Sequence, residues 1–168
     1  MSKAFTKESD DESDEASPVR PALPPGVQNL ITPEGAQRLQ EQISSLIDQK
    51  RVTQARQSPE AASSQPEVRN IENRLRRLQQ LLDSVVVSQP AKKDPERVAF
   101  GSTVRTRGSN GDEMTYRIVG VDETNLERGH ISWRSPLARA LLSKRVGDQV
   151  RFTTPEGAEN LIIIEVMT

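Results

Sequence analysis

Few side chains in this 168-residue chain are of the types that carry out covalent chemistry. His130 is the only histidine and there is no cysteine, which excludes histidine-based triads, multi-histidine metal sites, thiolate zinc sites and cysteine nucleophiles. No Rossmann or Walker phosphate-binding motif occurs, and Gly108, Gly111 and Gly120 are typical of turns. We therefore expect a protein that is not an enzyme, needs no cofactor and holds no metal ion, with His130 at the entry to a strand.

Two glutamates, Glu60 and Glu67, lie near a break between two helical segments. Exposed acidic residues near a loop are more commonly solvated than bound to metal, so we expect these carboxylates to face solvent.

Aromatic residues number only five, which is too few to line a pocket built from several aromatic rings. We expect four of them to serve as packing residues. Trp133 is the exception, because its amphipathic ring suits an interface. The five are Phe5, Phe100, Tyr116, Trp133 and Phe152.

The segment from Gly129 to Val150 has the clearest local pattern in the chain. A short strand (131–133) leads into Ser135, a good N-cap, with Pro136 at the first helical position, where its missing N–H is not needed. Apolar residues at helical spacing follow, and a Val-Gly-Asp turn at 146–148 starts a strand over 149–153. This combination resembles the C-terminal domain of the bacterial Gre-type transcription elongation factors.

Two helices precede this domain. The first begins at Thr32, a threonine cap followed by Pro33, and both helices carry apolar residues at alternating spacings of three and four, with a polar end to the first. A segment with two prolines and several serines (58–66) separates them and predicts an antiparallel hairpin. The expected seam positions are Leu39, Ile43, Leu46, Lys50 and Thr53 in the first helix, and Val68, Ile71, Leu75, Leu78, Leu82 and Val85 in the second.

The predicted fold class is α+β in four segments. An acidic, proline-rich tail (1–30) is expected to be disordered, and a coiled-coil hairpin (31–88) follows. A linker (89–97) then leads to a domain of antiparallel strands with one helix (98–168). In that domain Asn110-Gly111 predicts a β-hairpin turn and 161–164 reads as a central strand. By resemblance the domain is FKBP-like.

Formal charge is −1, so the composition does not favour direct binding to DNA or RNA, and any contact with nucleic acid is expected only through an elongation complex. No segment approaches the ~20 apolar residues of a membrane span. We expect a soluble, cytoplasmic monomer that does not bind membranes.

The resemblance implies a partner, RNA polymerase, whose secondary channel receives the coiled coil. In the family an Asp-x-x-Glu pair at the tip helps hold a second magnesium ion in the polymerase and promotes cleavage of backtracked RNA. The corresponding residues here are Gln57, Ser58, Pro59 and Glu60, so the aspartate is replaced. The hairpin is also shorter than in typical cleavage factors by about a dozen residues, which retracts the tip by roughly 9 Å.

The resemblance also places docking at the Ser135-Pro136 turn, which in relatives meets a coiled coil at the rim of the channel. Candidate docking residues are Trp133, Arg134, Ser135 and Pro136, and Arg134 stands where relatives often carry an acidic residue. We expect a channel-binding regulator without strong cleavage activity. The alternatives are a cleavage factor that uses Glu60 and, since regulators of nucleoside diphosphate kinase have a similar domain, a regulator of that enzyme.

Overall fold

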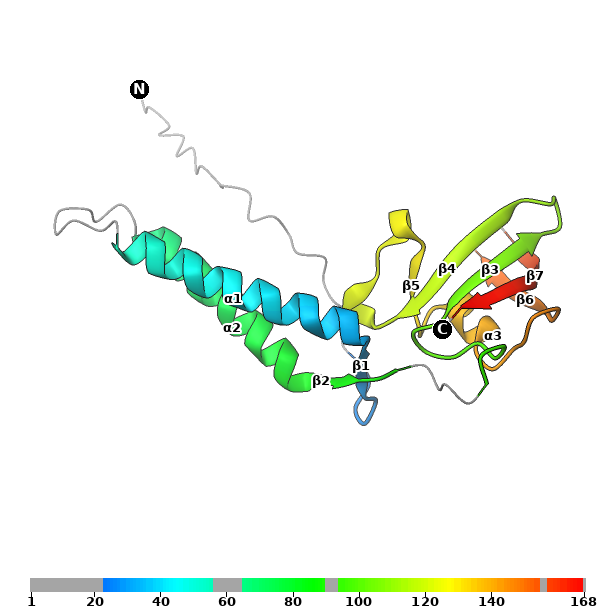
Figure 1. The fold of residues 1–168 in the computed structure, drawn as a ribbon, viewed down its shortest axis with the longest axis horizontal. Coiled ribbons are helices and arrows are strands. Elements are labelled where there is room, and N and C mark those ends of the chain that lie inside the picture. Colours follow the sequence, from blue (N-terminus) through cyan, green and yellow to red (C-terminus); the bar gives the residue numbers. More distant parts are fainter. Residues whose placement is uncertain (1–22, 56–64, 90–93, 155–156, 168) are drawn as a thin grey trace, which may run out of the picture.

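The computed structural model describes residues 23–55, 65–89, 94–154 and 157–167. Figure 1 shows two parts, a pair of long helices and a sheet domain from which the pair projects. Most of the expected tail and the whole segment from 56 to 64 lie outside the described residues. The α+β fold class, with an N-terminal helical hairpin and a C-terminal sheet domain that carries one helix, is confirmed.

The hairpin consists of α1 (Pro33–Ala55) and α2 (Gln65–Ser84), which run side by side in opposite directions (Figure 1). The expected seam positions are buried or half-buried, whereas most residues between them are exposed. At the polar end of the seam, Lys50 Nζ lies 2.7 Å from a carboxylate oxygen of Glu72 on α2. The three-four spacing therefore identified the contact face of both helices.

A two-stranded parallel sheet at the base of the hairpin was not predicted. Strand β1 (Asn29–Ile31) pairs with β2 (Val85–Val87), and the Ser88 N–H extends the pairing by donating to the Ile31 carbonyl at 2.9 Å. Three successive valines favour a strand over continued helix because branching at Cβ restricts χ1. The expected tail (1–30) is thus too long by two residues, since Asn29 and Leu30 belong to β1.

The larger sheet has the strand order β5-β4-β3-β7-β6. As predicted, Asn110 and Gly111 lie in the turn of the β3–β4 hairpin, and Gly111 has φ +88°, a conformation that side chains disfavour. Strand β7 lies between β3 and β6, as expected for an interior strand. The bounds are β3 (Thr103–Gly108), β4 (Glu113–Val119), β5 (His130–Ser132), β6 (Gln149–Thr154) and β7 (Gly157–Met167).

The expectation of an entirely antiparallel sheet is wrong, because β5 pairs with β4 in parallel. Two short 3-10 helices, η2 (Val121–Glu123) and η3 (Leu126–Arg128), occupy the connection between these strands. This connection brings His130 back beside Arg117, in the second half of β4, so β5 runs in the same direction as β4. The sheet is therefore mixed.

Helix α3 (Pro136–Leu141) packs on one face of the sheet and closes the core of this domain. Tyr116 and Phe152 pack against that core, as expected. Trp133 is partly buried and packs against the same core, and its expected interface role stays a prediction. The buried members of the core are Val98, Val104, Ile118, Ile131, Ala138, Leu141, Val150, Leu161 and Ile163.

The end of the expected linker (89–97) is attached to the sheet domain. Asp94 accepts an ion-paired hydrogen bond from Arg145 at 2.5 Å, and Arg97 forms a β-bridge with the same residue. These contacts attach the chain to the sheet domain from Asp94 on, four residues before the expected start of that domain at 98. The predicted linker residues 90–93 lie outside the described residues.

Leu39→Ala should lower the free energy of unfolding of the hairpin by about 2–5 kcal/mol, because the Leu39 side chain is 5% exposed within the seam. Its neighbour Gln40 is exposed, and Gln40→Ala is the matched control. Urea unfolding followed by circular dichroism at 222 nm measures both. Equal midpoints for the two variants would contradict the seam assignment.

Candidate docking site

The turn before α3 is built by backbone and side-chain hydrogen bonds. Ser135 has an extended backbone (φ −61°, ψ 151°), and its Oγ accepts from the Ala138 N–H at 3.1 Å. Pro136 follows at the start of the helix, as predicted. Just before it, the Arg134 N–H donates to the Ser132 Oγ at 3.2 Å. The cap therefore holds the turn in one conformation without help from a partner.

The four predicted docking residues differ in their exposure to solvent. Arg134 and Pro136 are exposed. Ser135 is half-buried, and its hydroxyl oxygen accepts the hydrogen bond that caps the helix. Trp133 is half-buried against the core, and its indole Nε1 is buried with no hydrogen-bond partner among the described residues. Arg134 and Pro136 are the two of the four that present side chains to solvent.

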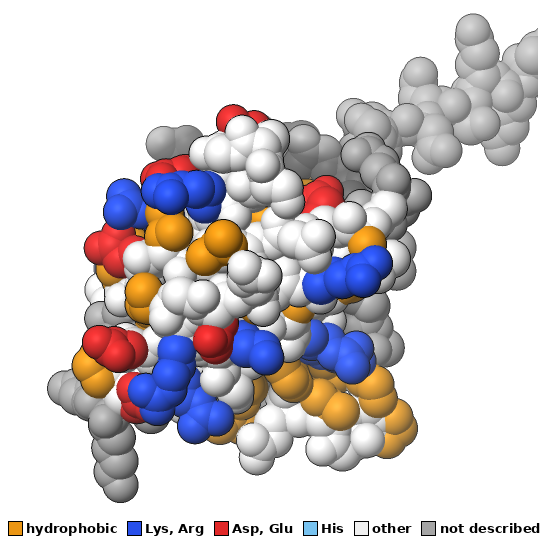
Figure 2. Space-filling view, turned by 90° about the vertical axis from the view of Figure 1, so that its right-hand side faces the viewer, with side chains coloured by type: hydrophobic (Ala, Val, Ile, Leu, Met, Phe, Trp, Pro, Cys, Tyr) orange, Lys and Arg blue, Asp and Glu red, His pale blue; other side chains and the backbone are white. Residues whose placement is uncertain are grey.

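Charges of both signs cover the end of the molecule formed by the sheet domain (Figure 2). Arg105 pairs with Glu165 at 2.9 Å and Arg107 with Glu113 at 2.7 Å, both between neighbouring strands. The guanidinium of Arg107 also lowers the pKa of the Glu113 carboxyl. These pairs neutralise two of the arginines on this face.

The predicted tip residues, Gln57 to Glu60, lie outside the described residues. Glu67 lies in the first turn of α2 and is exposed. Within the described part of the chain, no group of three acidic, histidine or cysteine side chains could hold a metal ion. Nor is any described helix long and apolar enough to cross a membrane.

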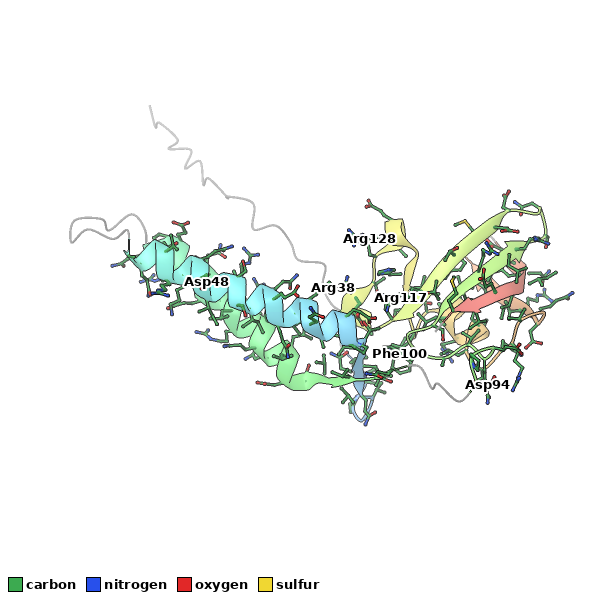
Figure 3. All side chains as sticks on the ribbon, in the orientation of Figure 1. Arg38, Asp48, Asp94, Phe100, Arg117 and Arg128 are labelled. Atoms are coloured by element: carbon green, nitrogen blue, oxygen red, sulfur yellow. The ribbon has the colours of Figure 1, made fainter. Side chains whose placement is uncertain are left out.

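A contact between the two parts of the molecule centres on Glu123 at the end of η2. One carboxylate oxygen accepts from the Thr32 N–H at 2.9 Å and from the Gly120 N–H at 3.0 Å. The other accepts from the Thr32 hydroxyl and lies 3.5 Å from the Arg38 guanidinium. Arg38 and Arg117 both lie near this junction in Figure 3. The Glu123 side chain is 4% exposed, so this contact is sheltered from solvent.

Two titratable groups border the junction. The pKa of Glu34 is lowered, first by a hydrogen bond from its own backbone N–H and then by Arg117, 3.0 Å away. Burial lowers the pKa of His130, and the charges of Arg117 and Arg38 act in the same direction. His130 lies at the start of β5, as expected, and is held in its neutral form more strongly than a free histidine.

Sequence reasoning identified Thr32 as a helix cap but missed Glu123. The Thr32 Oγ does accept from the Gly35 N–H at 3.0 Å, which is the local signal of a cap. Glu123 follows Thr32 by 91 residues, and an acidic residue in a loop carries no indication of such a distant partner. Glycines at Gly35 and Gly120, where the two parts approach closely, were the one available hint.

The comparisons with known proteins agree with this architecture. Residues 92–168 match the family model described as "Transcription elongation factor, GreA/GreB, C-term". The chain is 35% identical over 151 residues to transcription elongation factor GreB of Neisseria meningitidis, a match that covers 82% of this chain and 93% of the relative. It is 36% identical over 149 residues to GreB of Pseudomonas aeruginosa, covering 82% and 89%.

The class of protein is therefore that of the transcription elongation factors. Within it, this chain belongs to the GreA/GreB family, and the match extends beyond the sheet domain into the hairpin. Among solved structures, GreA factor homolog 1 (Gfh1) of Thermus thermophilus is 22% identical, with a TM-score of 0.41, over 84% of this chain and all of its own. That score is too low to compare the placement of the two parts.

Proposed function

We propose that this protein binds RNA polymerase through its sheet domain, inserts its coiled coil into the secondary channel and regulates elongation without strongly stimulating transcript cleavage. It acts by binding and not as an enzyme, as a monomer, and meets nucleic acid only through the elongation complex. Membership of the GreA/GreB family supports the choice of partner. The same membership favours polymerase over a nucleoside diphosphate kinase.

The length of the hairpin carries the proposal. Helix α1 has 23 residues and α2 has 20, so at 1.5 Å per residue the rod extends about 30 to 35 Å. Metal ligands must be placed within a few tenths of an ångström of their position. A rod that is too short by several residues in each helix therefore fails to bring Glu60 to a magnesium ion, and Gln57 supplies no carboxylate beside it.

Cleavage stimulation through Glu60, with Glu67, is the second candidate. Family membership favours it, because the relatives matched over most of this chain are elongation factors of the GreA and GreB types. The two candidates share the docking step and differ only in what the tip does. Binding and cleavage must therefore be measured separately.

Pro136→Arg should weaken binding to RNA polymerase by at least about tenfold, equivalent to about 1.4 kcal/mol, because it places a long charged side chain on the exposed turn. The fold should persist, since the Ser135 cap remains and the first helical position accepts many residues. Fluorescence anisotropy of labelled protein with purified polymerase measures the affinity, and thermal melting checks the fold.

Pro95→Arg is the matched control, because Pro95 is an exposed proline in a turn of the same domain and the change of charge is identical. It should bind as the parent does. Equal affinity of folded Pro136→Arg and Pro95→Arg would remove the Ser-Pro turn from the docking surface. A parent protein that fails to bind polymerase would overturn the proposed function itself.

A further inference from the structure

Glu123 completes the N-terminal cap of a helix that belongs to the other part of the molecule. At the start of α1, the Thr32 Oγ accepts a hydrogen bond from the Gly35 N–H, and the same hydroxyl donates a hydrogen bond to the Glu123 carboxylate. The Thr32 N–H points at the same carboxylate, at 2.9 Å. A local cap and a distant one therefore share the Thr32 hydroxyl, which joins the first turn of α1 to η2.

The charge of Glu123 suits this position. A buried carboxylate is costly unless it is paired and hydrogen-bonded, and this one receives three hydrogen bonds and has Arg38 close by. It also lies at the positive end of the α1 dipole, where a negative charge is stabilised. The site thus demands a carboxylate, and a neutral side chain of the same shape would lose the ion pair and one acceptor.

Two glycines allow the backbones to meet at this contact. A Cβ at Gly120 would overlap the Leu30 carbonyl oxygen, and a Cβ at Gly35 would overlap the Glu123 carboxylate. The Asn29 amide, on the strand before α1, donates to Asp122 at 3.1 Å. The first turn of α1 and the strand before it are therefore in close contact with η2 at several points, around one buried charge.

We propose that Glu123 is a positioning residue that fixes the direction in which the coiled coil projects from the sheet domain. This inference rests on the proposed function in one respect, since a fixed direction matters to a rod that enters a channel while the other domain docks outside it. Among the described side-chain links between the two parts, Arg117 pairs with Glu34 and Asn29 donates to Asp122, whereas Glu123 joins the Thr32 N–H, the Thr32 hydroxyl and Arg38 at one buried carboxylate.

The direction can be measured by electron spin resonance, because the chain has no native cysteine to interfere with labelling. Spin labels at Gln49→Cys on α1 and Gln149→Cys on β6, both exposed sites, report the distance between the parts. Labels at Gln42→Cys and Gln79→Cys report the hairpin alone. The background variants are Glu123→Ala, Glu123→Gln and the control Glu127→Gln, an exposed glutamate in η3.

We expect one narrow distance distribution between the parts in the parent and in Glu127→Gln, and a distribution at least twice as broad in Glu123→Ala. Glu123→Gln should lie between them. The distance within the hairpin should not change in any variant. An unchanged narrow distribution in Glu123→Ala would overturn the proposal, and so would simultaneous broadening within the hairpin, because Glu123 would then support folding and not direction.

Gly120→Ala provides a second perturbation that leaves the carboxylate in place. Its methyl group would push against the Leu30 carbonyl, so it should broaden the same distribution if the contact sets the angle. This variant keeps the proposal testable if Glu123→Ala does not fold. A narrow, unshifted distribution in folded Gly120→Ala would contradict the proposal.

A polymerase experiment connects direction to function. A hydroxyl-radical probe on Gln54→Cys, an exposed site near the end of α1, should cut bound polymerase at a narrow set of positions with the parent and at a wider set with Glu123→Ala. Identical cutting patterns would contradict the positioning role. If the parent does not bind polymerase at all, the proposed function fails while the spin-label distances still decide the role of Glu123.

Discussion

Added to a backtracked transcription complex with magnesium, this protein should bind and yet leave the rate of RNA cleavage at its unstimulated level. Gln57 replaces the tip aspartate that the family uses, so one of two carboxylates is missing. The described parts of the two helices span 23 and 20 residues. A hairpin shorter by about a dozen residues than in typical cleavage factors is expected to retract its tip by roughly 9 Å. Gel analysis of the cleaved transcript measures the rate.

Both deficits must be repaired before cleavage appears. Gln57→Asp alone should remain inactive, whereas a chimera in which a full-length, acidic-tipped hairpin replaces residues 39–82 should cleave. This exchange keeps Thr32, Gly35 and Glu123, so the contact between the two parts is retained. Robust magnesium-dependent cleavage by the unmodified protein, lost on Glu60→Ala, would reject the proposal and establish the second candidate.

Ile163→Ala should destabilise the sheet domain by about 2–5 kcal/mol, because Ile163 is completely buried in the core of this domain and its truncation leaves a cavity. Ile162 is the matched control, since it precedes Ile163 on β7, points to the opposite face and is 40% exposed. Ile162→Ala should cost less than about 1 kcal/mol. Chemical denaturation followed by Trp133 fluorescence reports on this domain.

The contrast between the two isoleucines tests the register of the interior strand. A one-residue shift of β7 would exchange their faces and reverse the result. Equal destabilisation by both substitutions would mean that both faces of β7 are covered, which would contradict the one-sided packing of α3. A matching loss of polymerase binding in Ile163→Ala would follow from unfolding and would say nothing about docking.

The features that the sequence determined by itself are those with local causes. The three-four spacing of apolar residues identified the seam of α1 and α2, because a helix brings positions three and four apart onto one side. Ser135 with Pro136 predicted the start of α3, and Asn110 with Gly111 predicted the β3–β4 turn, because each pair meets a backbone requirement within a few residues.

Tertiary structure decided what depends on residues far apart in the chain. The parallel pairing of β1 with β2 joins residues 56 positions apart, and the Glu123 contact spans 91. The parallel direction of β5 comes from the crossover through η2 and η3. The partial burial of Trp133 against the core of the sheet domain likewise depends on residues far along the chain and could not be predicted from its type alone. Local propensity cannot identify such partners, because the free energy that selects them is gained only when distant segments of the chain come into contact.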